Sequence, residues 1–288
     1  MELTELLIKG ANASVVVFVV SSTLGVGLSL TVRQILTPLR DARLIVLALL
    51  ANFMLTPLAA LALWKALQLH EPLGVGLLLC GLAAGAPFLL KLAEFARGDM
   101  AFAVGLMVLL MVLTVGYVPL VLPLLLTGTT VNAAKIAQSL IVLMLIPLAT
   151  GLAVRARRAD MAARVRPVVA WVSTVSMVLV VSMMTAGHVN SVLDVFGTFG
   201  ILAAVIFTAL CAIVGWTLGG PRTGTKGVLA LGTAQRNTAA AFVVAGQNFS
   251  DPTVVVMIAV VMIVEFVMLM PLSRLLARRT QVAVAGQA

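Results

Sequence analysis

Three charged side chains lie inside stretches that are otherwise apolar enough to cross a membrane: Lys91, Arg236 and Glu265. Placing one charge in hydrocarbon costs roughly 2.5–3.5 kcal/mol on insertion scales, so such residues usually face a cavity, a partner or a bound ion. A lysine or an arginine binds anionic groups, and a glutamate binds cations. The chemistry that these residues indicate is therefore ion and anion binding at membrane depth.

Two of these charges follow interruptions in their apolar stretches. Residues 80–99, CGLAAGAPFLLKLAEFARGD, place Pro87 shortly before Lys91, and proline removes a backbone donor and breaks a helix. The later stretch LGTAQRNTAAA surrounds Arg236 with polar side chains. A helix broken at mid-membrane leaves free N–H and C=O groups that bind ions and small anions. Close helix packing around glycine is the alternative explanation for each break.

Other reactive residues form no recognisable catalytic or metal site. The sequence contains no HExxH motif, no phosphate-binding loop and no intramembrane Ser–His or Asp–Asp pair, so we do not expect an enzyme. His70 and His188 are far apart, which argues against a metal pair. Cys80 and Cys211 lie inside apolar stretches, so no structural disulfide is expected. We predict no cofactor.

The elements that must position these residues are membrane helices. The chain has 288 residues, 62% apolar and 10% charged, with a mean hydropathy of +1.17. A soluble domain could not bury so much apolar surface, and long apolar windows are typical of helices rather than of an outer-membrane barrel. We predict an all-α polytopic membrane protein in which residues 1–288 form a single transporter domain. The nine predicted spans are 12–31, 43–66, 73–96, 100–126, 134–154, 167–187, 196–218, 226–248 and 253–276.

The basic residues indicate the orientation of these spans. Of the 19 Lys and Arg residues, 14 follow odd-numbered spans on one side, and only Lys9, Lys65 and Lys135 lie on the other. The positive-inside rule then places the N-terminus outside an inner cell membrane and the C-terminus in the cytoplasm. Because topology explains the net charge of +9, no nucleic-acid partner is expected. The N-terminal segment MELTELLIKG lacks a basic n-region, so we expect no signal peptide.

The two interrupted spans occupy matching positions in the two halves of the chain. When the halves are aligned from their C-terminal ends, span 73–96 matches span 226–248, and the two run in opposite directions across the membrane. This pattern predicts two inverted repeats, each with a broken helix, the first repeat lacking its first helix. We find no convincing residue identity between the halves, so this prediction depends on topology and on the positions of the breaks.

The motifs LAEFARGDMAFAV, GTAQRNTAAAFVVA and TLGVGLSLTVRQI resemble the bile acid:sodium symporter family, and the resemblance covers roughly residues 12–280. Bacterial relatives generally have ten helices, and this chain is similar to the nine-helix form. The resemblance implies a panel domain packed against a core domain, with the broken helices crossing in the core and substrate between the domains. The panel would comprise residues 12–31, 134–154 and 167–187, and the core would comprise the other six spans.

The resemblance also implies that the sodium ligands of the family are largely lost. One site uses oxygen-bearing side chains where this chain has apolar residues: Leu89, Leu90, Ala103, Met107 and Leu231. Apolar side chains supply none of the oxygens that replace the hydration shell of sodium. The second sodium site keeps more of its ligands. The amide side chain that the second helix supplies in the family corresponds to Asn52, and the glutamine of the site corresponds to Gln235. Arg236 follows this glutamine, where the family often has Asn.

We hypothesise that Lys91 and Arg236 supply the positive charge that sodium supplies in relatives. Transport would then be uncoupled from sodium, or a proton on Lys91 would replace the ion. In the alternative, Lys91 extends toward the cytoplasmic headgroups and pairs with Glu94 three residues later. An ion pair between Arg236 and Glu265 is the corresponding alternative for the second cation.

The predicted function is secondary transport of a small organic anion across the lipid bilayer by alternating access. The two half-helix ends and Arg236 would hold the anionic group, Asn237, Thr233 and Gln235 would provide hydrogen bonds, and Glu265 and Pro87 would lie close to the substrate. Apolar walls of the panel would hold the rest of the substrate. The resemblance implies bile acids, steroid sulfates, keto acids or pantoate-like acids as substrates. The alternatives are an ordinary sodium- or proton-coupled symporter, a channel, and a non-transporting membrane sensor.

Overall fold

The computed structural model describes residues 2–36, 41–126, 132–187 and 198–285, and this part of the chain is helical without strands. Six of its helices are long and apolar enough to cross a membrane, judged by length and composition. They are Ala42–Ala66, Met100–Leu125, Ala133–Arg157, Ala159–Val180, Gly200–Leu218 and Pro252–Arg278. This confirms an all-α polytopic protein, while the count of nine spans and the inverted repeats remain predictions.

Each of the nine predicted spans overlaps helices of the described chain. In chain order these are α1 (Glu2–Ser29), α2 (Val32–Leu36), α3 (Ala42–Leu50), η2 (Ala51–Leu55), α4 (Thr56–Ala66), α5 (Glu71–Leu82), α6 (Leu89–Phe95), α7 (Met100–Leu125), α8 (Ala133–Leu140), η3 (Ile141–Leu145), α9 (Ile146–Arg157), α10 (Ala159–Gly187), α12 (Gly200–Leu218), α13 (Thr223–Ala234), α14 (Thr238–Asn248) and α15 (Pro252–Ala285).

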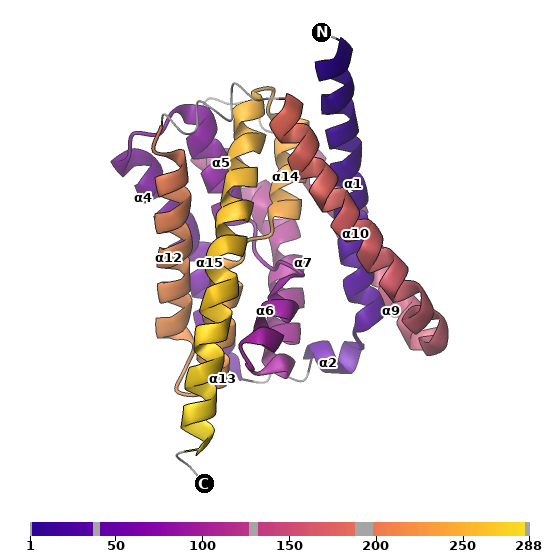
Figure 1. Ribbon diagram of the computed structural model, residues 1–288, viewed down its shortest axis with the longest axis vertical. Coiled ribbons are helices and arrows are strands. Elements are labelled where there is room, and N and C mark those ends of the chain that lie inside the picture. Colours follow the sequence, from indigo (N-terminus) through magenta and orange to yellow (C-terminus); the bar gives the residue numbers. More distant parts are fainter. Residues whose placement is uncertain (1, 37–40, 127–131, 188–197, 286–288) are drawn as a thin grey trace.

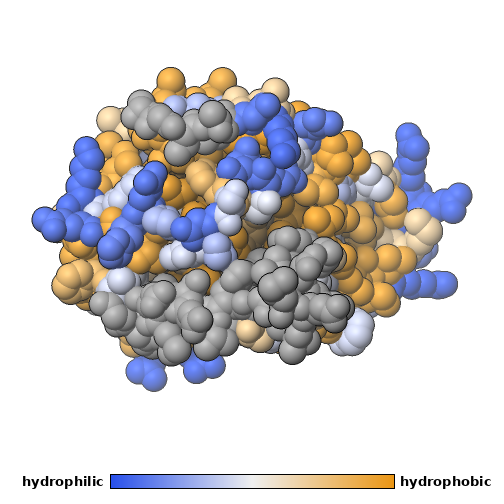
Figure 2. All heavy atoms as spheres, turned by 90° about the horizontal axis from the view of Figure 1, so that it is seen from above, coloured by the Kyte–Doolittle hydropathy of each residue, from blue (hydrophilic) through white to orange (hydrophobic). Residues whose placement is uncertain are grey.

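Helices α1, α9 and α10 pack together along one side of the molecule (Figure 1). Gly27 of α1 and Gly151 of α9 allow this close approach, because a Cβ atom on Gly27 would lie only 2.3 Å from the carbonyl oxygen of Leu148. Helices α12, α13 and α15 pack against one another on the other side, next to α5. Figure 2 looks onto one end, with apolar side chains around much of the periphery and hydrophilic side chains across the end face. The predicted panel corresponds to the α1–α9–α10 group, and its role as a domain remains a prediction.

Two helices contain a π-helical turn just before a proline. The turn η2 precedes Pro57, and the turn η3 precedes Pro147. Pro57 lacks the N–H that would bond to the carbonyl of Phe53 four residues earlier, and the hydroxyl of Tyr117 donates to that carbonyl instead. Asn52 lies within η2 and is fully buried, which fits the tendency of π turns to occur at functional positions.

Both predicted breaks are present. Residues 83–88 separate α5 from α6, and residues 235–237 separate α13 from α14. Gly85, in the first break, has φ +82°, and a Cβ atom there would lie 2.2 Å from the backbone nitrogen of Met111. The left-handed backbone and the lack of space both require glycine, so this break is built into the sequence.

Several helices are longer than the spans predicted for them. The predicted spans leave the basic segment 155–166 between two of them, but α9 continues to Arg157 and α10 begins at Ala159. Only Arg158 lies between the helices. Arginine and alanine are good helix formers, so the helices extend beyond the apolar segments that hydropathy detects.

Candidate functional site

The two helix breaks lie against each other. The backbone N–H of Asn237 donates to the carbonyl of Ala83 at 3.0 Å, and Nδ2 donates to the carbonyls of Ala84 and Gly85 at 3.3 and 3.1 Å. Oδ1 of the same side chain accepts from the N–H of Ala240 in the first turn of α14. One asparagine thus satisfies backbone groups of both breaks, and we call this meeting point the crossover.

The guanidinium of Arg236 is enclosed by four oxygens at the crossover. Nε donates to the carbonyl of Cys80 at 2.9 Å and Nη2 to that of Gly81 at 2.9 Å, while Nη1 donates to Thr233 O at 3.0 Å and Asn52 Oδ1 at 2.8 Å. The side chain is 0% exposed. Cys80 and Gly81 lie in the last turn of α5, where carbonyls lack partners within the helix and form the negative end of its dipole. The guanidinium therefore sits where carbonyl and amide oxygens stabilise a cation.

Glu265 of α15 binds the same break through hydrogen bonds. Its Oε1 accepts from the backbone N–H of Arg236 at 3.1 Å, and its Oε2 accepts from Nε2 of Gln235 at 2.8 Å. Within the described chain, no ion pair joins this carboxylate to the Arg236 guanidinium, so the alternative in which the two side chains pair is wrong. The physical reason is that the guanidinium extends toward the end of α5, while the carboxylate caps the unwound backbone.

The positions that the resemblance assigns to the first sodium site are filled by apolar packing. Four of them are 0% exposed, namely Leu89, Ala103, Met107 and Leu231. A Cβ atom on Gly232 would lie 3.0 Å from Cδ2 of Leu89, which shows how closely that leucine packs on the second broken helix. The fifth position, Leu90, is partly exposed.

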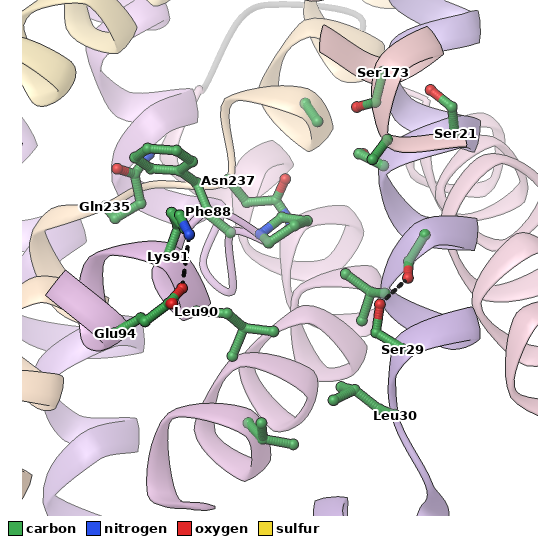
Figure 3. Close-up of a pocket in the computed structure, with 18 of the residues that line it drawn as sticks. Ser21, Ser29, Leu30, Phe88, Leu90, Lys91, Glu94, Ser173, Gln235 and Asn237 are labelled. Atoms are coloured by element: carbon green, nitrogen blue, oxygen red, sulfur yellow. Dashed lines mark hydrogen bonds and ion pairs between the residues drawn. The ribbon is translucent and has the colours of Figure 1, made fainter. Parts of the chain in front are cut away.

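A cavity of about 1160 Å³ lies beside the crossover, between the α1–α10 side and the broken helices (Figure 3). Buried residues 235–239 and the first break line it, and so do four exposed charged residues: Arg33, Lys91, Glu94 and Arg166. Of the predicted substrate residues, Pro87, Arg236 and Asn237 line the cavity, whereas Thr233 and Glu265 do not. Of the predicted cation-site residues, Leu90, Lys91 and Gln235 line it.

Lys91 lies on the exposed wall of this cavity. Its Nζ is 2.8 Å from Oε2 of Glu94, and the side chain is 52% exposed (Figure 3). The ammonium also lies 5.1 Å from the centroid of the Phe95 ring. The pairing with Glu94 is confirmed, and of the two cations only Arg236 is enclosed at the crossover.

Hydroxyl groups on the opposite wall were missed by sequence reasoning, which predicted apolar panel walls. The hydroxyl groups that line this wall of the cavity come from two helices (Figure 3). They belong to Ser21, Ser22 and Ser29 of α1 and to Ser173 and Thr174 of α10. The signal that could have revealed them is helical spacing, because residues 21 and 29 are eight apart and lie on one face of α1.

A family model for the sodium bile acid symporter family matches residues 14–195, more than half of the chain. A comparison with curated proteins finds no match. The match ends before α13, so the second break and its contacts with the first come from the structure. His188, one of the two histidines considered above, lies outside the described residues.

Proposed function

The chain belongs to the sodium bile acid symporter family, a family of membrane transporters, and from this premise we propose that it carries an organic anion by alternating access with Arg236 as a resident cation. By resident cation we mean a positive charge that is part of the chain and takes the place of an exchangeable metal ion at the crossover. The ordinary sodium-coupled symporter of the same family is the competing function.

The single observation that carries this proposal is the enclosure of the Arg236 guanidinium by four oxygens. One of them belongs to Asn52, which the resemblance equates with a ligand of the second sodium site. A sodium ion bound among these oxygens would lie within about 4 Å of the guanidinium, and two unit charges at that distance repel by about 4 kcal/mol at an effective dielectric constant of about 20. Such repulsion disfavours sodium at this site and supports the proposal.

The packing at the other implied site supports the same conclusion. Leu89, Ala103, Met107 and Leu231 are fully buried and present no side-chain oxygen. Hydrated sodium loses far more in shedding its water than an apolar pocket can return. Neither of the two implied sites therefore favours an exchangeable sodium ion, and the positive charge at the crossover is permanent.

The charges around the cavity support an anionic substrate. The exposed charged residues that line the cavity are three cations, Arg33, Lys91 and Arg166, and one carboxylate, Glu94. The first residues of α14 also line it, and the positive end of the dipole of this eleven-residue helix attracts anions. Arg33 and Arg166 belong to the predicted cytoplasmic side, so we propose that this cavity opens toward the cytoplasm.

Uptake of radiolabelled cholate into proteoliposomes that contain the full chain tests the proposal. We expect saturable uptake at the same initial rate with external sodium or potassium, together with counterflow when unlabelled cholate is preloaded. Counterflow separates a carrier from a channel. Strong dependence on sodium, or uptake without counterflow, would contradict the proposal.

Two single variants complete this experiment. Arg236→Asn removes the resident cation, and we expect it to lose sodium-independent uptake. Lys65→Asn removes an exposed cation that does not line the cavity, and it serves as the matched control that keeps Arg236. If the two variants show equal rates of sodium-independent uptake, Arg236 is not the resident cation.

A further inference from the structure

A second groove, of about 370 Å³, lies between α1 and α10 and is separate from the cavity beside the crossover. Among the described residues, the two share Ser21 alone. We propose that this groove binds one acyl chain of an anionic phospholipid whose phosphate lies on the arginines at the junction of α9 and α10. We name it the valine groove, and its lining residues are Val16, Val17, Val20, Ser21, Leu24, Val168, Val169 and Val172.

The valine groove is apolar and lies at the surface of the molecule. Val16 and Val17 of α1 and Val168 of α10 are 42%, 44% and 61% exposed. The hydroxyl of Ser21 donates to the carbonyl of Val17 at 2.6 Å, so it needs no partner from an occupant. In a chain that spans a membrane, such a surface faces hydrocarbon. An acyl chain in the groove makes van der Waals contact with two helices at once, which a flat helix surface does not offer.

The groove extends away from the arginines along α1. Helix α10 runs back along α1 in the opposite direction (Figure 1). A Cβ atom on Gly25 would lie 3.6 Å from Cγ1 of Val169, so these two residues are at the same level. From that level α1 leads to Val16, nine residues or about 13 Å away, while α10 leads back to Arg164 in the other direction. A phosphate at Arg164 therefore places the acyl chain at the start of the groove.

The charge at this end of the groove is complementary to a phosphate. Arg164 precedes Val168 and Val172 by four and eight residues, so the three residues share one face of α10. Arg158 and Arg164 are exposed, and within the described chain neither forms an ion pair. Guanidinium groups without a carboxylate partner bind phosphate oxygens well. The charged residues of the junction are Arg155, Arg157, Arg158, Asp160, Arg164 and Arg166.

A basic segment on the cytoplasmic side is by itself only a topology signal. Arg274 and Arg278 of α15 are exposed and belong to the same predicted side, yet no residue of α15 lines the groove. The junction differs because an apolar groove continues from its arginines. Trp171, seven residues or about 10 Å beyond Arg164, is 66% exposed, and tryptophan prefers the membrane interface. This places the arginines at the level of the headgroups.

Native mass spectrometry of the full chain, purified and delipidated in detergent, tests this site. The probes are dioleoyl phosphatidylglycerol, dioleoyl phosphatidylcholine, which has the same chains and a neutral headgroup, and glycerophosphoglycerol, which has the headgroup without chains. We expect the first phosphatidylglycerol to bind about tenfold or more tightly than the first phosphatidylcholine, because each basic residue near an anionic headgroup contributes about fivefold. Glycerophosphoglycerol should show no binding at the same concentration.

Two pairs of variants separate the headgroup from the acyl chain. Arg158→Gln/Arg164→Gln should reduce the preference for phosphatidylglycerol by about tenfold or more and leave phosphatidylcholine binding unchanged. Arg274→Gln/Arg278→Gln removes the same charge from the same predicted side and is the matched control that keeps the preference.

The second pair changes the groove and leaves its charge intact. Val168→Phe places a larger side chain in the groove and should weaken the binding of both phospholipids without changing the ratio of their affinities. Val178→Phe is the matched control, because Val178 is also on α10, is 54% exposed and does not line the groove. Both substitutions are apolar and at the surface, so neither is expected to disturb folding.

Four outcomes would overturn the proposed lipid site. Equal affinity of the wild type for the two phospholipids, or equal loss of preference in the two arginine variants, would show that the junction does not recognise the headgroup. Equal lipid binding by the two phenylalanine variants, or binding of glycerophosphoglycerol as tight as that of the lipid, would show that the groove holds no acyl chain. Dimers that form without bound lipid and are lost in Val168→Phe would make this face an interface between copies of the chain. The proposed transport of organic anions is unaffected by all of them.

Discussion

Single residues hold the crossover together by satisfying backbone groups that the two breaks leave open. Asn237 bonds to carbonyls of the first break, Arg236 binds the carbonyls at the end of α5, and Glu265 accepts from the unwound backbone. Each of these groups would otherwise be unpaired and buried, at a cost of about 1–3 kcal/mol per group. The polar residues at the crossover are therefore structural supports as well as candidates for function.

Gly85→Ala tests how strictly the first break requires glycine. A Cβ atom at this position meets the α7 backbone at 2.2 Å, and φ is +82°. We expect a loss of more than about 2 kcal/mol of stability, because the left-handed strain alone is about 1–2 kcal/mol and the overlap adds to it. The loss is measured as a lower melting temperature of the purified protein.

Gly116→Ala is the matched control on α7. No atom lies within 4 Å of a Cβ atom built there, and alanine is the better helix former. Its melting temperature should equal or exceed that of the wild type. An unchanged melting temperature in Gly85→Ala would show that the first break can relax around a side chain.

At the scale of the elements, one contact joins α8 to the end of α14. The backbone carbonyl of Gln247 accepts a hydrogen bond from Nζ of Lys135 at 3.2 Å. The side-chain Oε1 of Gln247 accepts another from the hydroxyl of Ser139. Helix α8 begins the predicted panel segment 134–154, and α14 follows the second break in the predicted core. Alternating access requires such contacts to separate when the carrier opens to the opposite side.

Cross-linking of α8 to α14 should therefore stop transport. In the variant Ser139→Cys/Gln247→Cys, a short bifunctional methanethiosulfonate joins the two helices through disulfide bonds, and we expect cholate uptake to stop and to recover when a reductant cleaves them. Each single cysteine variant is a control, and the native Cys80 and Cys211 are buried. Undiminished uptake by the cross-linked protein would show that this contact does not separate during the cycle.

At the scale of the whole molecule, the distribution of charge predicts how the chain is inserted. Most of the arginines lie on the side predicted to be cytoplasmic, and moving them across the bilayer is unfavourable. We expect His70→Cys to react with a membrane-impermeant maleimide in intact cells and Arg158→Cys to react only after permeabilisation. Both residues are exposed in the structure, so labelling reports membrane side rather than burial. The reverse labelling pattern would invert the predicted topology.

Much of the fold could be predicted because its causes are local. Apolar windows indicate the membrane helices, and Pro87 with Gly85 and the polar run at Arg236 indicate the two breaks. The pairing of Lys91 with Glu94 follows from helical spacing alone, since residues three apart are neighbours on a helix surface. Features that depend on a few consecutive residues are thus accessible from the sequence.

Only the tertiary structure decided where the polar groups of the crossover point. The guanidinium of Arg236 binds the carbonyl of Cys80, 156 residues away, rather than the carboxylate of Glu265, and Asn52 reaches it from a π turn 184 residues away. The hydroxyl groups of Ser21, Ser29 and Ser173 likewise line one cavity only because α1 and α10 pack together beside it. The sequence by itself determined the membrane class, the positions of the breaks and the presence of buried charge. The partner of each charge depended on packing, because a buried side chain binds whichever oxygens the fold brings within reach.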